Sequence, residues 1–108
     1  MLIYNTTFHI DGEHLLSPFL TFMREEYVPA VIADGHLRNP RFVRLMVDLG
    51  DALTGYALMC DVDDVLTLKL WKQQTGQELE SRLFNRFGEK VLMFSTAMKD
   101  VTEKVTSL

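Results

Sequence analysis

The chain has 108 residues, of which 47% are hydrophobic and 24% are charged, and its formal net charge is −4 at pH 7. These proportions are typical of one globular domain and exclude a disordered or collagen-like chain. The acidic balance argues against a nucleic-acid partner, because phosphate groups attract a basic excess. The one cysteine, Cys60, excludes an internal disulfide framework and any metal site built from several cysteines.

Targeting and membrane signals are missing from the sequence. The N-terminus has no basic segment followed by an unbroken apolar run, so we expect no signal peptide and a cytoplasmic protein. Apolar stretches stay far below the roughly 18 residues of a membrane span, so no membrane partner is expected. Without a linker or a repeat, residues 1–100 are predicted to form one domain and residues 101–108 a polar C-terminal tail.

Alternation of side chains predicts three strands, at residues 2–10, 41–49 and 56–62, and residues 91–98 are predicted to form the last strand. In the first three runs, apolar residues recur at every second position, which is the period of a strand with one buried face. A loop rich in glycine joins the second and third strands as a hairpin.

Two helices are predicted between these strands. The first carries apolar residues at helical spacing up to residue 33, with Asp11 as its N-cap, and Pro29 should kink or break it. The second begins after the capping residue Asp63, is weakened at Thr75-Gly76 and ends at Gly88.

The order β-α-β-β-α-β predicts an α+β ferredoxin-like fold, a four-stranded antiparallel sheet with two helices on one face. The helix-covered face should carry the more apolar set, which is Leu2, Tyr4, Phe8, Val43, Leu45, Val47, Tyr56 and Leu58. The other, open face should carry Ile3, Asn5, Thr7, His9, Phe42, Arg44, Met46, Ala57 and Met59. Because that mixture is too apolar to face water, we expect a homodimer in which a second copy covers it.

Three segments carry a family resemblance: residues 1–7 (MLIYNTT), 19–29 (FLTFMREEYVP) and 86–90 (RFGEK). Through them the chain resembles, over nearly its whole length, a bacterial family of domains of unknown function common in Bacteroidetes. Position 27 is often His in that family and is Tyr27 here, and position 59 is often Gln and is Met59 here.

That family is similar in turn to the dimeric α/β-barrel superfamily, whose ferredoxin-like subunits pair sheet face to sheet face. The resemblance implies a dimeric α/β barrel. It leaves two kinds of function open: a domain that binds a small molecule without chemistry, or a cofactor-free or haem-linked monooxygenase or isomerase. A shared fold does not decide between them.

Five residues form the candidate site for a small acidic or aromatic ligand. Asn5, Thr7 and His9 recur at every second residue of the first strand, so their side chains should point into the space over the open face. Arg44 should be the only cation there, where it would bind a carboxylate or pair with an acid. Tyr27 should border this space from the kinked first helix. Alternatively, these groups satisfy one another and the partner subunit, with no cavity between them.

Asn5 and Trp71 also suggest a haem-degrading enzyme, because the resemblance extends to haem-degrading monooxygenases that use an Asn, a Trp and a later His. All three histidines, His9, His14 and His36, precede Trp71, so the iron-ligating position is missing. The sequence therefore predicts no cofactor and no metal site.

Overall fold

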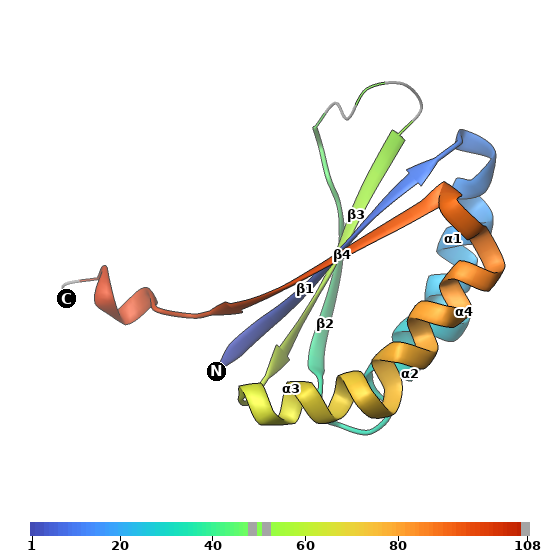
Figure 1. Cartoon of the computed structure of the whole chain (residues 1–108). Helices are drawn as coiled ribbons and strands as arrows, with labels where there is room; N and C mark the ends of the chain where they lie inside the picture. The colour runs from blue at the N-terminus through green and yellow to red at the C-terminus, as the bar shows by residue number, and fades with distance from the viewer. Residues whose placement is uncertain (48–49, 51–52, 107–108) are drawn as a thin grey trace.

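The computed structural model describes residues 1–47, 50 and 53–106. Its four antiparallel strands lie in the order β2-β3-β1-β4 (Figure 1). The strands are β1 (Leu2–Asp11), β2 (Arg38–Arg44), β3 (Leu53–Val62) and β4 (Val91–Lys99). Two long helical segments cover the same face of this sheet, so the predicted α+β ferredoxin-like fold is confirmed. In the described part of the chain, no helix is long and apolar enough to cross a membrane.

The first helical segment is interrupted immediately before its proline. It consists of η1 (Glu13–Leu15), α1 (Leu16–Phe22), the π turn η2 (Met23–Tyr27) and α2 (Val28–Ile32). Pro29 has no N–H to donate within the helix, and the wider π turn absorbs this defect. The helix therefore changes type before Pro29 and is not broken there, because Val28–Ile32 continues as α-helix.

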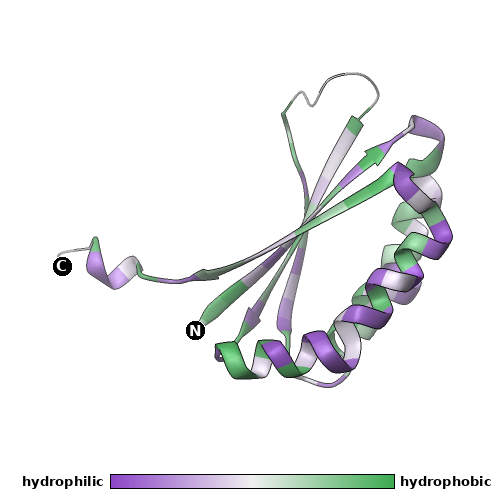
Figure 2. Cartoon of the chain, viewed as in Figure 1, coloured by the Kyte–Doolittle hydropathy of each residue, from purple (hydrophilic) through white to green (hydrophobic). Residues whose placement is uncertain are grey.

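The second helical segment also contains a π turn. It consists of α3 (Val65–Trp71), the π turn η3 (Lys72–Gly76), α4 (Gln77–Phe87) and η4 (Gly88–Lys90). Both helical segments contain hydrophobic and hydrophilic residues in turn along their length, as expected of amphipathic helices with one buried face (Figure 2). Residues 101–106 contain one further turn, η5 (Thr102–Lys104).

Both predicted helix caps are wrong. Asp11 ends β1, and its carboxylate lies 3.7 Å from the Lys90 ammonium. In the second segment the cap is Asp64, which accepts a hydrogen bond of 2.7 Å from the Thr67 N–H. That hydrogen bond lowers the pKa of Asp64. Asp63 instead accepts a bond of 2.7 Å from Arg38, which lowers the pKa of the Asp63 carboxyl.

The core lies between the sheet and the helices. Its centre is aromatic, and Phe8 of β1 packs against both Phe19 and Tyr27 of the first segment. A buried hydrogen bond of 2.9 Å from Trp71 Nε1 to the Val31 carbonyl connects the two helical segments. This bond satisfies a carbonyl near the C-terminal end of α2 that has no partner within its own helix.

The faces of β2 differ from the prediction. The Phe42 ring stacks on Tyr56 with centroids 5.2 Å apart and packs against Phe19, so it faces the helices. Arg44 lies opposite Tyr56 and shares that side of the sheet, whereas Val43 lies opposite Ala57 on the open face. Placing Phe42 and Arg44 on the open face was therefore wrong. A phenylalanine ring gains more from burial than the smaller valine next to it, and a single strand cannot bury both.

The predicted second strand also extended too far. The observed strand β2 begins at Arg38, has a register shift between Arg38 and Arg41, and ends at Arg44. Met46 follows the strand and is 86% exposed, so it does not line the sheet face. Residues 48 and 49 of the predicted strand lie outside the described residues.

Candidate functional site

The sheet separates the five predicted site residues into two groups. Asn5, Thr7 and His9 lie on the open face of β1, as predicted from the strand alternation. Tyr27 is buried on the helix side, and Arg44 is exposed at the end of β2 on that same side. The five side chains therefore do not form one cavity, and a ligand-binding role of the open-face group stays a prediction.

The open-face group makes contacts of its own. The Asn5 amide donates a hydrogen bond of 3.1 Å to Thr7 Oγ1. The His9 ring lies edge-on to Phe94 of β4, with centroids 5.4 Å apart. Asn5, Thr7 and His9 line neither of the two hollows described below.

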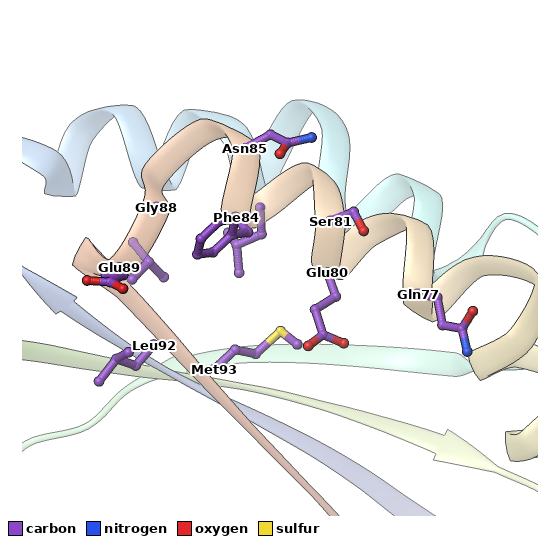
Figure 3. Close-up of a pocket in the computed structure, with 11 residues that line it drawn as sticks. Gln77, Glu80, Ser81, Phe84, Asn85, Gly88, Glu89, Leu92 and Met93 are labelled. Atoms are coloured by element: carbon purple, nitrogen blue, oxygen red, sulfur yellow. The ribbon is translucent and has the colours of Figure 1, made fainter.

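A cleft lies on the opposite side, between α4 and β4 (Figure 3). We call it the α4–β4 cleft. Its outer part, of about 570 Å³, is lined by residues of α4, by Gly88 and Glu89 of η4 and by the start of β4. Its inner part, of about 370 Å³, reaches the sheet and the indole of Trp71. The two parts share Gln77, Glu80 and Met93, so they adjoin each other.

Three hydroxyl groups form the floor of the inner part. Thr6 Oγ1 and Ser95 Oγ lie 3.3 Å apart on neighbouring strands, and the Tyr4 side chain lies beside them. Burial raises the pKa of the Tyr4 phenol, and a hydrogen bond with Ser95 partly opposes that rise. The floor is therefore uncharged at neutral pH. Because its hydroxyls bond one another, only the hydroxyl protons left over from these internal bonds can be donated to a bound oxygen atom.

Tyr27 adds a fourth hydroxyl at the inner end of the cleft. Its phenol donates to the Met93 sulfur at 3.7 Å, and a thioether is a weak acceptor. Burial is the main cause that raises the pKa of Tyr27, and the charge of Glu80 adds to it. This phenol consequently stays protonated, and an oxygen acceptor in the cleft would be a better partner than the sulfur.

Two charged side chains lie at the mouth of the inner part. The Lys72 ammonium lies over the Tyr4 ring, 5.3 Å from its centroid. The Glu80 side chain extends from α4 toward the sheet, beside Met93 (Figure 3). In the described part of the chain neither group forms an ion pair, and no cluster of histidine, cysteine and acidic residues could hold a metal ion.

A second hollow of about 600 Å³ lies between the first helical segment and β2. It is lined by Leu20, Met23, Arg24, Val28, Pro29, Ile32 and Phe42. Apart from Arg24 its side chains are apolar, so it offers little to orient a ligand. The α4–β4 cleft is the better candidate.

Sequence reasoning missed this cleft because its width depends on how α4 packs over β4. One feature of the sequence does point to the cleft. Thr6 and Ser95 are polar residues on the apolar, helix-covered face, and they lie opposite each other in the β1–β4 ladder. A pair of hydroxyls on a buried face must find partners, and in this fold they find each other.

Comparison with known proteins gives a family and a fold. Residues 1–101 match the family described as Domain of unknown function (DUF4286). No curated protein matches the chain in sequence.

Three solved structures are similar to the chain. An ethyl tert-butyl ether d (EthD) family protein from Bacillus halodurans C-125 is 14% identical with a TM-score of 0.69, covering 94% of this chain and 100% of that one. A dimeric ferredoxin-like protein from an uncultured marine organism is 11% identical with a TM-score of 0.64, covering 93% and 94%. The de novo designed protein Foldit4 is 6% identical with a TM-score of 0.60, covering 92% and 97%. Such identities establish the fold alone.

Proposed function

Since the chain belongs to the DUF4286 family, whose function is unknown, we propose a function from its own surfaces: it is a homodimeric protein that binds a small organic molecule in the α4–β4 cleft. The observation that carries the binding function is the hydroxyl floor of Tyr4, Thr6 and Ser95 at the bottom of an open cleft. Small-molecule sites are concave and mostly apolar, with a few converging polar groups. In this cleft the outer part has the more apolar walls, and the polar groups converge in the inner part.

The shape of the cleft suggests how the ligand lies. A carbonyl or phenolic oxygen would accept hydrogen bonds from the floor, and the apolar body would lie along Phe84 and Met93 in the outer part. Phe84 points into the cleft, although 60% of its surface is exposed in the free protein (Figure 3). A ligand that covers this ring would gain the hydrophobic free energy that the free protein leaves unused.

Binding can be tested with three aromatic carbonyl compounds: phenylacetone, phenylpyruvate and para-hydroxyacetophenone. Each is titrated into the labelled protein and followed by amide chemical shifts. We expect the shifts to change at Thr6, along Gln77–Phe87 and at Ser95. If no compound changes them, or if the changes are confined to Asn5, Thr7 and His9, the proposed site is wrong.

A matched pair of variants on one strand makes the test specific. Thr6→Val removes a hydroxyl from the cleft floor and keeps the shape of the side chain, so affinity should fall about tenfold for one lost hydrogen bond. Thr7→Val makes the same change one residue later, on the open face, and should leave affinity unchanged. The reverse pattern would place the ligand on the open face.

The second copy is proposed to cover the open face. Val43, Leu92, Phe94 and Met98 are 40–54% exposed on that face in the free chain. The accessible surface of the chain is 6899 Å², against about 6,100 Å² for a compact monomer of its mass. The excess is comparable to the roughly 800 Å² that each partner buries in an interface of standard size. The dimeric ferredoxin-like neighbour supports this assembly by analogy.

Light scattering tests the dimer. The wild-type protein at tens of micromolar should have twice the chain mass of 12.4 kDa. Phe94→Glu introduces a charge at the most exposed aromatic ring of the open face and should halve the measured mass. The control is Leu66→Glu on α3, where a leucine that is 70% exposed lies away from that face, and the dimer should persist. A monomeric wild-type protein would contradict the proposed dimer and would not affect the proposed binding in the cleft.

A further inference from the structure

We infer that the α4–β4 cleft also transfers protons: the Glu80 carboxylate removes a C–H proton next to a carbonyl group whose oxygen is bound by the hydroxyl floor. This inference rests on the proposed function, because the carbonyl compound must occupy the cleft. It adds a reaction to that function, the enolisation of the bound molecule.

Glu80 is placed for this role by its position on α4. It directly follows the buried Leu79, so it lies at the border of the face that packs on the sheet. Figure 3 shows its side chain extending into the space between α4 and β4. It lines both parts of the cleft, so a molecule bound in either part lies next to this residue.

The carboxylate of Glu80 is also available. In the described part of the chain it forms no hydrogen bond or ion pair, whereas Glu78, two residues earlier, accepts a bond of 2.8 Å from Arg82. A base that is already paired must lose its partner before it accepts a proton. Glu80 has no such partner among the described residues, whereas Glu78 is paired with Arg82.

The hydroxyl floor supplies the second requirement, stabilisation of the negative charge that develops on oxygen. Neutral donors that are already positioned where this charge appears lower the barrier of such a step. The phenols of Tyr4 and Tyr27 have raised pKa values, so both keep the proton that they must donate. The Lys72 ammonium over the Tyr4 ring adds a positive charge on the same side.

The reaction is balanced without a co-reactant. The C–H bond breaks, its proton moves to the Glu80 carboxylate, and its electron pair forms a carbon–carbon double bond while the carbonyl π pair moves to oxygen. The enolate oxygen accepts hydrogen bonds from the floor. The proton then returns from Glu80 to the same carbon, or to another carbon of the conjugated system, which gives an isomer. A carboxylate base combined with neutral hydroxyl donors is sufficient for this chemistry.

Hydrogen–deuterium exchange of phenylacetone provides the test, because its benzylic C–H bonds are next to the carbonyl. In deuterated water, proton NMR follows the loss of the benzylic signal. The wild-type protein should accelerate this loss over buffer. Glu80→Gln keeps the size of the side chain and should reduce the acceleration about 100-fold or more, the usual contribution of a general base. Its affinity for phenylacetone, from amide shifts, should be retained.

The control is Glu78→Gln, which makes the same chemical and charge change on the same helix, outside the cleft, and should exchange at the wild-type rate. If phenylacetone binds in the cleft and the wild type exchanges no faster than Glu80→Gln, the inference is wrong and the proposed binding function stands. If none of the three compounds binds, both are wrong.

Discussion

Gly76 lies directly against the indole of Trp71: a Cβ built at position 76 would lie 2.8 Å from Cζ3 and 3.2 Å from Cε3 of the ring. The backbone of Gly76 has ordinary helical angles, with φ −60° and ψ −44°, so the close approach of the ring, and no backbone strain, requires glycine here. The same indole donates its N–H to Val31 in the first helical segment. Gly76 therefore permits the contact that joins the two segments.

Gly76→Ala should destabilise the protein. In an unobstructed helix this substitution stabilises by about 1 kcal/mol. Here the added methyl group must displace a buried ring, and overpacking of this kind usually destabilises by about 1–3 kcal/mol. We expect a net loss in the free energy of unfolding, measured in urea. Gln74→Ala, at an exposed position of the same turn, is the control and should be close to neutral. A Gly76→Ala protein more stable than wild type would contradict the packing.

Trp71→Phe should reduce the free energy of unfolding by about 1–3 kcal/mol, because the buried Val31 carbonyl loses its donor. Thr75→Ala offers a control between the same two segments, since it removes a hydrogen bond of 3.2 Å to Asp34 that is exposed to water. Water can replace that exposed bond, so Thr75→Ala should have a much smaller effect. Equal losses in the two variants would mean that burial of the tryptophan bond adds nothing.

The strand alternation was sufficient to predict the topology and the faces of β1. In β1, large apolar residues occupy one parity and polar residues most of the other, so only one orientation buries Phe8. In the second strand, residues 42–47 (FVRLMV) have apolar side chains at both parities. A slip of one residue then turns every side chain over, and the stacking of Phe42 on Tyr56 decides the orientation.

Tyr27 lies four residues from both Met23 and Val31, so helical spacing places it on the buried side, and assigning it to the open-face site was wrong. In a regular α-helix over residues 16–32, each residue would be rotated by the same angle from the one before it. The π turn η2 contains an extra residue and so changes the direction of the side chains that follow it. Tyr27 ends that turn and is directed into the core against Phe8 and Phe22. Pro29 indicates that the helix changes near Val28, but the proline does not indicate by what angle the following residues are rotated.

The stability of the protein should fall in alkaline solution. Burial raises the pKa of Tyr4 and of Tyr27 in the folded chain, so these phenols hold their protons to higher pH than in the unfolded chain. The unfolded state therefore binds fewer protons above about pH 10, and the free energy of unfolding decreases there by up to about 1.4 kcal/mol per pH unit for each group. Below the unfolded pKa this contribution is constant. Urea unfolding between pH 8 and 11 measures the slope.

Tyr27→Phe should make that alkaline slope shallower, because the phenylalanine ring has no proton to lose. The variant also loses only a weak hydrogen bond to the Met93 sulfur, so its stability near neutral pH should change little. A wild-type free energy of unfolding that stays flat through this pH range would contradict the raised pKa of both phenols.

The thiol of Cys60 should be unreactive in the folded protein. Its side chain is 1% exposed on the helix-covered face of β3. Burial, with a smaller contribution from Asp61, raises the pKa of the Cys60 thiol to about 11, so the reactive thiolate is scarce at physiological pH. Ellman's reagent at about pH 8 should detect no thiol in the native protein and one per chain in concentrated urea. Leu66→Cys places a thiol at an exposed position of α3 and should add one that reacts at once. If native Cys60 reacted as fast as that added thiol, this face of β3 would be open to solvent, and the packing of the helices over the sheet would be wrong.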